Sequence, residues 1–153
     1  MSMQKIRKGD TVKVIAGIPV YRLYNVKGNG DHLFTTSASE KNTLTLRGWK
    51  YEGIAWYAPK TSSTAVYRFY NANNGTHMYT KAAAERTAMT GAGWKQEGIA
   101  FYSCTDSSKV PVYRLYNPNN GQHFFTKAVS EKNTLVKAGW KYEGIGFYAL
   151  SIS

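Results

Sequence analysis

The hexapeptide VYRLYN occupies residues 20–25, returns as VYRFYN at residues 66–71, and returns again as VYRLYN at residues 112–117. The step between copies is 46 residues both times. A repeat of this length is one supersecondary unit, which cannot bury its apolar face alone and must pack against its neighbours. We therefore expect three similar units in one body, with any functional site present up to three times.

Two further motifs follow each hexapeptide in the same order. The first is a Gly-x-His tripeptide, which starts at Gly30, Gly75 and Gly121. The second is a Gly-Trp-Lys-x-Glu-Gly-Ile heptapeptide, which lies at residues 48–54, 93–99 and 139–145. The fixed order of three motifs predicts that the units share one internal structure.

The local pattern of each unit predicts the order strand, strand, helix, strand. The hexapeptide is aromatic and β-branched, which is typical of a strand. An Asn-Gly pair then indicates a tight hairpin turn, since both residues accept positive φ values. We expect the return strands at residues 32–35, 77–80 and 123–126.

A helix is expected in the second half of each unit, over residues 37–47, 82–92 and 128–138. Ser37 and Glu40 have the spacing of a capping box, and Thr80 and Thr126 are the expected caps of the other two helices. A Gly follows each helix, where a left-handed residue often ends it. The unit closes on a strand that should bend at its glycine, which is Gly53 in the first copy.

The expected fold class is β-rich with short helices (α+β), built as a closed pseudo-threefold ring that resembles a small propeller or trefoil. A linear stack needs end repeats that differ from the middle one, and here the outer copies are as regular as the second. Closure also removes exposed strand edges. Large apolar strand residues such as Leu23 and Ile54 are expected in the core. The ring should span residues 18–153, with repeats at about 18–63, 64–109 and 110–153.

Residues 1–17 lie outside the repeat and form a basic N-terminal segment. Residues 4–17 resemble the start of the bacterial large-subunit ribosomal protein that carries a KOW motif, although Ile18 and Pro19 follow where that family continues with a basic turn. The resemblance implies contact with RNA. The residues alone predict one strand, 11–16, that pairs with the edge of the ring. A foreign leader that replaces a secretion signal is a further interpretation of this segment.

The chain carries 20 Lys and Arg against nine Asp and Glu, a formal net charge of +11. Such a surface favours anionic partners, which include nucleic acid, acidic polysaccharide, teichoic-acid-like polymers and anionic membranes. The single cysteine, Cys104, excludes an intramolecular disulfide. No stretch approaches the roughly 20 apolar residues of a membrane span, and residues 1–17 lack the apolar run of a secretory signal.

The candidate ligand-binding residues are one Arg, one His and one Glu from each unit. Arg and Glu lie in mid-strand, where they predict either an ion pair that ties strands or adjacent units, or the lining of a pocket for a ligand's hydroxyls or charges. The His beside the turn predicts a hydrogen-bonding role. Three imidazoles could hold zinc, but no carboxylate or cysteine has ligand spacing beside them, so neither metal nor cofactor is expected. The candidates are Arg22, His32, Glu52, Arg68, His77, Glu97, Arg114, His123 and Glu143.

Enzyme signatures are missing from the sequence. It contains no Gly-rich phosphate loop, no His-Glu-x-x-His and no Gly-x-Ser-x-Gly. A carboxylate pair such as Glu40 and Glu52 would recur in the other units and would require three active sites. We therefore expect no catalytic residues and no enzymatic activity.

The repeat resembles a family of uncharacterised modules found in secreted bacterial and fungal proteins, most closely at residues 113–118, 121–126 and 139–148. In Gram-positive bacteria such modules often accompany cell-wall hydrolases or other extracellular glycosidases. The resemblance implies an extracellular or cell-surface location and an accessory role in binding glycan. We expect a non-enzymatic, lectin-like module that binds carbohydrate or cell-wall glycan through up to three equivalent sites. The alternatives are a basic nucleic-acid-binding protein and a structural or engineered scaffold without a small ligand.

Overall fold

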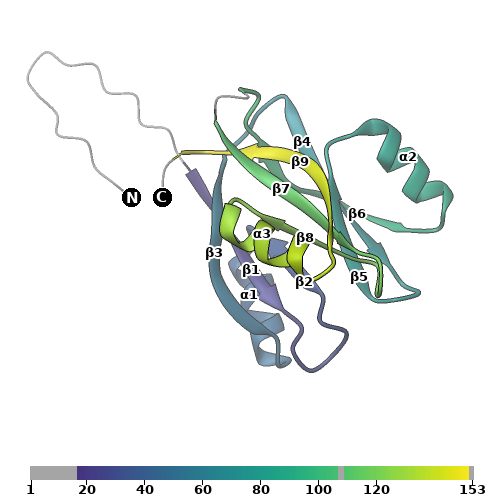
Figure 1. Cartoon of the computed structure of the whole chain (residues 1–153). Coiled ribbons are helices and arrows are strands. Elements are labelled where there is room, and N and C mark those ends of the chain that lie inside the picture. The colour runs from purple at the N-terminus through teal and green to yellow at the C-terminus, as the bar shows by residue number, and fades with distance from the viewer. Residues whose placement is uncertain (1–16, 107–108, 152–153) are drawn as a thin grey trace, which may run out of the picture.

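The computed structural model describes residues 17–106 and 109–151 (Figure 1). The expected strand over residues 11–16, with the rest of the segment before Gly17, lies outside the described residues. The three repeats form three units, each with the element order strand, strand, helix, strand. The prediction of this order is confirmed in every unit.

The elements have nearly the same lengths in the three units. Unit 1 contains β1 (Gly17–Tyr24), β2 (His32–Thr35), α1 (Ala38–Leu46) and β3 (Lys50–Pro59). Unit 2 contains β4 (Thr64–Asn71), β5 (Thr76–Thr80), α2 (Ala83–Gly91) and β6 (Lys95–Ser103). Unit 3 contains β7 (Val110–Asn117), β8 (Gln122–Thr126), α3 (Val129–Lys137) and β9 (Lys141–Ala149). Each helix has nine residues and lies within one residue of its predicted bounds, and none of the described helices is long and apolar enough to cross a membrane.

Each unit forms its own three-stranded antiparallel sheet, with the hexapeptide strand in the middle. The strand orders are β2-β1-β3, β5-β4-β6 and β8-β7-β9. Among the described residues the strands pair only within their own unit, so the three sheets are separate. The first strand and the residue that follows the last strand both bond to β3 (Figure 1), because Gly17 pairs with Pro59, and Leu150 donates its N–H to the carbonyl of Tyr57 at 2.9 Å.

The last strand of each unit contains a glycine in the left-handed region, as its predicted bend requires. The φ values are 97° at Gly53, 97° at Gly98 and 98° at Gly144. In unit 1 the register between β1 and β3 shifts at this point, which interrupts the alternation of inward and outward side chains. Ile54 is 44% exposed as a result, and its expected place in the core is wrong, whereas Leu23 is fully buried.

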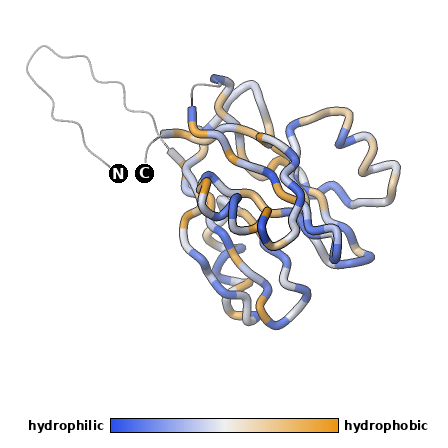
Figure 2. Tube along the Cα trace, in the orientation of Figure 1, coloured by the Kyte–Doolittle hydropathy of each residue, from blue (hydrophilic) through white to orange (hydrophobic). Residues whose placement is uncertain are grey.

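The hairpin turns are hydrophilic and wider than a two-residue turn (Figure 2). In unit 2 the N–H of Gly75 donates to the carbonyl of Asn71 at 2.8 Å, and only the glycine has a positive φ, of 73°. The side chain of Asn71 accepts the N–H of Asn73 at 3.0 Å, and that of Asn74 accepts the N–H of Thr76 at 3.1 Å. These Asn side chains satisfy backbone donors that a tight turn would pair internally.

The helix starts differ between the units. Ser37 caps α1, because its hydroxyl accepts the N–H of Glu40 at 3.1 Å, but the predicted capping box is only half formed, since the N–H of Ser37 donates to Thr35 at 3.0 Å. In unit 2 the cap position is Ala82, and the predicted cap Thr80 is wrong. Thr80 instead accepts the N–H of Ala82 at 3.0 Å and donates to Glu85 at 2.6 Å. Thr126 makes the same two contacts in unit 3, so both threonines fix the link between strand and helix.

Two triangles of aromatic rings form the centre of the core. Each unit contributes one ring to each triangle, and every one of the six is at most 4% exposed. Neighbouring rings within a triangle have their centroids 5.2–5.9 Å apart. Burial of each ring contributes roughly 1.5–3 kcal/mol, so packing between units stabilises the whole body. The triangles are Phe34, Tyr79 and Phe125, and Trp56, Phe101 and Phe147.

Candidate functional site

The arginine of each hexapeptide lies where two units meet. Arg22 in β1 donates its Nε to Glu52 of β3 at 3.0 Å, and its Nη1 to Glu131 of α3 at 3.1 Å. The first contact lies within unit 1, and the second joins unit 1 to unit 3. One arginine thus holds a strand of its own unit and the helix of a neighbour.

The same arrangement recurs at the other two meeting points, and we name the three by the units they join. Junction 1/3 contains Arg22, His32 and Glu52 facing Glu131 of α3. Junction 2/1 contains Arg68, His77 and Glu97 facing Glu40 of α1. Junction 3/2 contains Arg114, His123 and Glu143 facing Glu85 of α2. The nine candidate residues are therefore brought together as three sets of three.

The helix glutamates are the members that sequence reasoning missed. Glu40, Glu85 and Glu131 each lie in the first turn of a helix, and Glu40 had been interpreted as part of a capping box and as a rejected catalytic partner of Glu52. Their recurrence at one position of all three repeats was the available signal. Hydrogen bonds from Arg114 hold the pKa of Glu85 below its usual range, so this carboxylate stays ionised at neutral pH.

Each histidine contacts the strand glutamate of its own unit through Nε2. The distances are 3.2 Å from His32 to Glu52, 3.5 Å in junction 2/1 and 3.3 Å in junction 3/2. Burial lowers the pKa of His32 to about 4, with the positive charge of Arg22 adding to the effect. Burial and the charge of Arg114 likewise lower the pKa of His123 to about 4. Both imidazoles are therefore neutral at pH 7.

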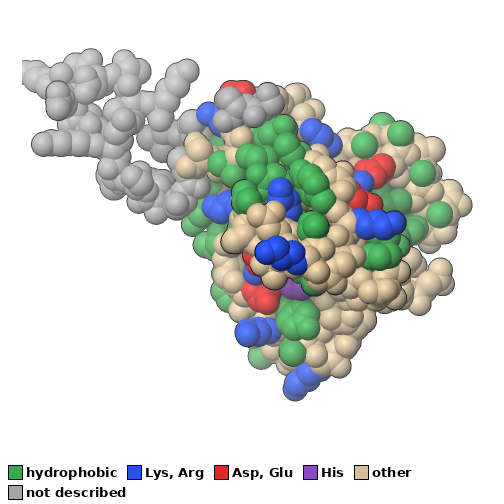
Figure 3. Space-filling view, in the orientation of Figure 1, with side chains coloured by type: hydrophobic (Ala, Val, Ile, Leu, Met, Phe, Trp, Pro, Cys, Tyr) green, Lys and Arg blue, Asp and Glu red, His purple; other side chains and the backbone are tan. Residues whose placement is uncertain are grey.

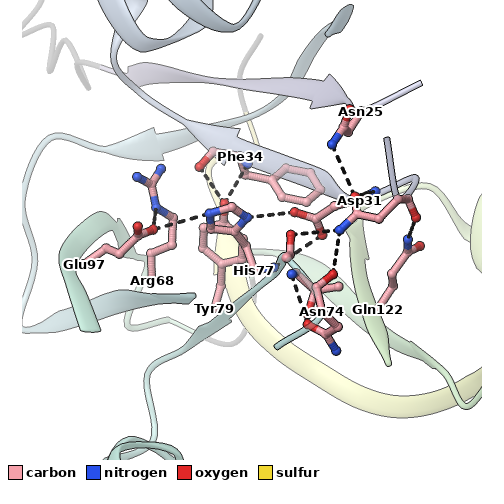
Figure 4. Close-up of polar contacts among 12 residues, drawn as sticks. Asn25, Asp31, Phe34, Arg68, Asn74, His77, Tyr79, Glu97 and Gln122 are labelled. Atoms are coloured by element: carbon pink, nitrogen blue, oxygen red, sulfur yellow. Dashed lines mark hydrogen bonds and ion pairs between the residues drawn. The ribbon is translucent and has the colours of Figure 1, made fainter. Parts of the chain in front are cut away.

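His77 differs from the other two histidines because it has an acidic partner. Its Nδ1 lies 2.7 Å from Oδ2 of the fully buried Asp31 (Figure 4). Burial opposes the charge on His77, but hydrogen bonds to Asp31 and Glu97 outweigh it and raise the pKa. Thr76 and Gln122 occupy the place of Asp31 in units 2 and 3, and both are buried. Nδ1 of His123 is buried without a hydrogen-bond partner among the described residues.

The acidic residues of the chain are concentrated in the junctions. All six glutamates lie in the three junctions, and no lysine among residues 17–106 and 109–151 forms an ion pair with any of them. Acidic side chains accordingly gather in small groups on the visible face, and basic ones are scattered over it (Figure 3). Some lysines lie over tyrosine rings instead, such as Lys41 at 4.7 Å from the centre of Tyr21. The outer surface is therefore cationic.

A pocket of about 350 Å³ lies at junction 1/3. Unit 1 supplies its polar wall, which consists of the Arg22, His32 and Glu52 side chains. Unit 3 supplies an aromatic and aliphatic wall together with two exposed hydroxyls. The residues of unit 3 that line the pocket are Phe124, Ser130, Glu131, Thr134, Leu135 and Trp140.

No metal site is evident in the part of the chain that the structure describes. No group of three or more His, Cys, Asp or Glu side chains there is arranged to hold an ion. The histidines lie one to each junction, each against its own glutamate. The side chains of a junction can form ion pairs, donate and accept hydrogen bonds, and pack against rings.

Residues 8–150 match the model of a family described as a domain of unknown function (DUF5648). No curated protein matches the chain, and no solved structure does.

Proposed function

Since the chain belongs to the DUF5648 family, whose description names no activity, we propose a function from the junctions: a non-enzymatic, lectin-like module that binds carbohydrate or cell-wall glycan. The observation that carries the proposal is the pocket at junction 1/3, which joins an aromatic wall to a cluster of charged and hydroxyl groups. Such a combination of apolar lining and a few convergent polar groups is characteristic of small-molecule sites.

A pyranose ring fits both halves of this lining. Its C–H faces pack on aromatic rings such as that of the half-buried Trp140, and its hydroxyls both donate and accept hydrogen bonds. Glu52 and Glu131 provide acceptors, and the guanidinium of Arg22 provides donors. Charge-assisted hydrogen bonds of this kind are stronger than neutral ones, so a few of them suffice to orient a sugar.

The proposal includes a closed, propeller- or trefoil-like ring in which up to three equivalent sites act together. It is supported by the cyclic order of the ion pairs, since each unit binds the helix of the one before it and unit 1 binds that of unit 3. Several weak sites on one body gain avidity toward a repetitive polymer. A cell-wall glycan is such a polymer, and an extracellular or cell-surface location follows from this role. The inter-unit pairs are Arg22–Glu131, Arg68–Glu40 and Arg114–Glu85.

The second candidate is nucleic-acid binding, which the cationic outer surface favours. Because the glutamates lie in the junctions, they do not pair with the exposed lysines. These lysines can therefore bind the phosphates of an anionic polymer. Binding to a phosphate backbone weakens steeply with salt, by roughly a thousandfold or more between 50 and 200 mM. Binding of a neutral glycan changes little over that range.

The experiment is a pull-down on purified cell walls combined with a glycan array, both with DNA as competitor and at two salt concentrations. We expect retention that survives DNA and 200 mM salt and that falls in Trp140→Ala, which removes one ring of the aromatic wall. A matched control replaces the exposed Lys50, Lys95 and Lys141 by Gln and should weaken only DNA binding. The lectin-like function is wrong if the protein is retained on no glycan and no wall.

A further inference from the structure

We propose that the three junctions have diverged, and that junction 1/3 is the principal ligand site and takes a neutral, polyhydroxylated six-membered ring rather than an acidic sugar. This inference rests on the proposed function. It keeps the lectin-like binding of glycan, replaces up to three equivalent sites by one principal site, and adds what charge the ligand carries. The three junctions can be compared residue by residue, because the repeats align without ambiguity around their shared motifs.

The first difference is in the pairing of the arginine. Arg68 donates Nη1 and Nη2 to the two oxygens of Glu40, at 2.9 and 2.8 Å. Arg114 does the same with Glu85, at 2.8 and 2.9 Å. Arg22 makes only one bond to its helix glutamate, and its Nη2 has no hydrogen-bond partner among the described residues. Junction 1/3 therefore retains a guanidinium donor for a ligand oxygen.

The second difference is the residue beneath the guanidinium. At junction 1/3 this is Phe124, whose ring centre lies 5.1 Å from the Cζ of Arg22. Leu33 and Met78 occupy the same place in the other repeats. An aromatic face attracts a guanidinium and competes with the carboxylate for its orientation. The ring also continues the apolar wall toward Trp140, with their centroids 6.4 Å apart.

The third difference is the supply of hydroxyl groups. Helix α3 lines the pocket with Ser130 and Thr134. Helix α1 has Ser39 and Thr43 at the same positions, whereas α2 has alanine at both. Junction 2/1 thus has the hydroxyls without the phenyl ring, and junction 3/2 has neither. Only junction 1/3 combines the ring, the hydroxyls and the free donor.

The charges of the pocket select a neutral ligand. Glu52 and Glu131 both contact Arg22, so two carboxylates share one guanidinium. His32 adds no compensating charge, because its pKa of about 4 keeps it neutral at pH 7. A carboxylated sugar would bring a third negative charge against two that are already close. The chain carries a net charge of +11, but the carboxylates of this pocket outnumber its guanidinium.

The repeat supplies three built-in reporters for a test. Trp140 lines the pocket, and Trp49 and Trp94 occupy its position in the other two units. Indole N–H signals in a two-dimensional NMR titration report each junction separately. The probes are chitotriose, which is neutral, and trigalacturonate, which is anionic. We expect chitotriose to shift the Trp140 signal with one site per chain, and trigalacturonate to bind at least tenfold more weakly.

Exchanging residues between repeats gives the matched variants. Phe124→Leu copies unit 1 and should weaken chitotriose binding about tenfold, whereas Leu33→Phe should leave the Trp140 response unchanged. Ser130→Ala with Thr134→Ala copies unit 2 at exposed positions, so it tests the site without disturbing the core. Thermal unfolding confirms that each variant folds.

The outcomes separate this inference from the proposed function. Equal shifts of the Trp49, Trp94 and Trp140 signals would leave a lectin with three equal sites and overturn the divergence. Tighter binding of trigalacturonate than of chitotriose would contradict the inference that the ligand is neutral. No shift with retention on cell walls would place the glycan site elsewhere. No shift of any Trp signal, together with no retention on cell walls, would contradict both this inference and the proposed function.

Discussion

His77 Nδ1 lies 2.7 Å from Asp31 Oδ2, and this contact ties unit 2 to unit 1 beside the hairpin turns (Figure 4). It breaks the threefold pattern, because Thr76 and Gln122 occupy the position of Asp31 in the other two repeats. Three histidines in equivalent places therefore have different pKa values. The pKa of His77 is raised, and those of His32 and His123 are lowered to about 4.

Replacing Asp31 should lower the pKa of His77, as the pKa values of His32 and His123 are lowered. Asp31→Gln copies unit 3, and we expect the pKa of His77 to fall below its ordinary value of 6.5. Loss of one partner from a buried pair costs about 3 kcal/mol, which should appear in urea unfolding at pH 6. Histidine C–H signals followed by NMR across pH measure the pKa directly. Thr76→Asp is the companion variant and should raise the pKa of His123, and an unchanged pKa in both variants would rule out this cause.

Acid should destabilise the protein as His32 and His123 take up protons. His32 and His123 have folded pKa values of about 4 against an ordinary value of 6.5, so the fold favours their neutral forms. Their contribution is fully present above pH 6.5 and is lost as the pH falls toward 4. Each is worth about 2–3 kcal/mol at the low end. The free energy of unfolding measured with urea should therefore fall between pH 6.5 and 4.5. The pKa values of Glu40, Glu85, Glu97 and Glu131 are lowered and lie below this window.

The three histidines also supply the control for that experiment. His32→Gln with His123→Gln should flatten the pH profile of unfolding. His77→Gln should not flatten it, since the raised pKa of His77 gives a contribution that is present below pH 6.5 and lost as the pH rises through the folded pKa. Flattening in His77→Gln alone would contradict the assignment.

The element order could be predicted from the sequence because its signals are local. Apolar spacing, Asn-Gly pairs and the glycine after each helix act within a few residues, and the helices fall within one residue of their expected bounds. The grouping of Arg22 with Glu52 was also foreseeable, since both lie in strands of one unit. The contact of Arg22 with Glu131 was not, because it depends on how units 1 and 3 pack.

Burial was harder to predict near the bends of the last strands. Alternation places Ile54 on an inward face, but the left-handed Gly53 and the shifted register turn it outward. The differences between junctions were equally hidden. In the sequence, the residue after each histidine is apolar and gives no sign of a difference in role; these residues are Leu33, Met78 and Phe124. Only the structure shows that the guanidinium of Arg22 lies over the ring of Phe124.

Two glycines of unit 2 should respond to alanine in opposite directions. A Cβ at Gly98 or at Gly91 would meet nothing within 4 Å, so neither change causes a clash. Gly98 has a φ of 97°, and Gly98→Ala should cost about 1–2 kcal/mol from backbone strain alone. Gly91 ends α2 without a positive φ, and Gly91→Ala should stabilise by about 0.5 kcal/mol. Urea unfolding of both variants checks the sign, and destabilisation by Gly91→Ala would show that α2 ends differently.

The inter-unit ion pairs should differ in coupling energy as they differ in geometry. Arg68 and Glu40 make two parallel hydrogen bonds with side chains 16% and 30% exposed, which should give a coupling of about 1–2 kcal/mol. Arg22 and Glu131 make one bond with Glu131 39% exposed, so the coupling should stay below about 1 kcal/mol.

Double-mutant cycles with Arg→Met and Glu→Gln at each pair measure the coupling by urea unfolding. The strand glutamate that shares each arginine stays in all four proteins of a cycle, so its contribution cancels where the pairs are independent. Arg114 and Glu85 are bidentate and should resemble the first pair. If the coupling energy of Arg22 with Glu131 equalled those of the two bidentate pairs, the loss of one hydrogen bond would not weaken the pair. The guanidinium of junction 1/3 would then be no more available to a ligand than the others.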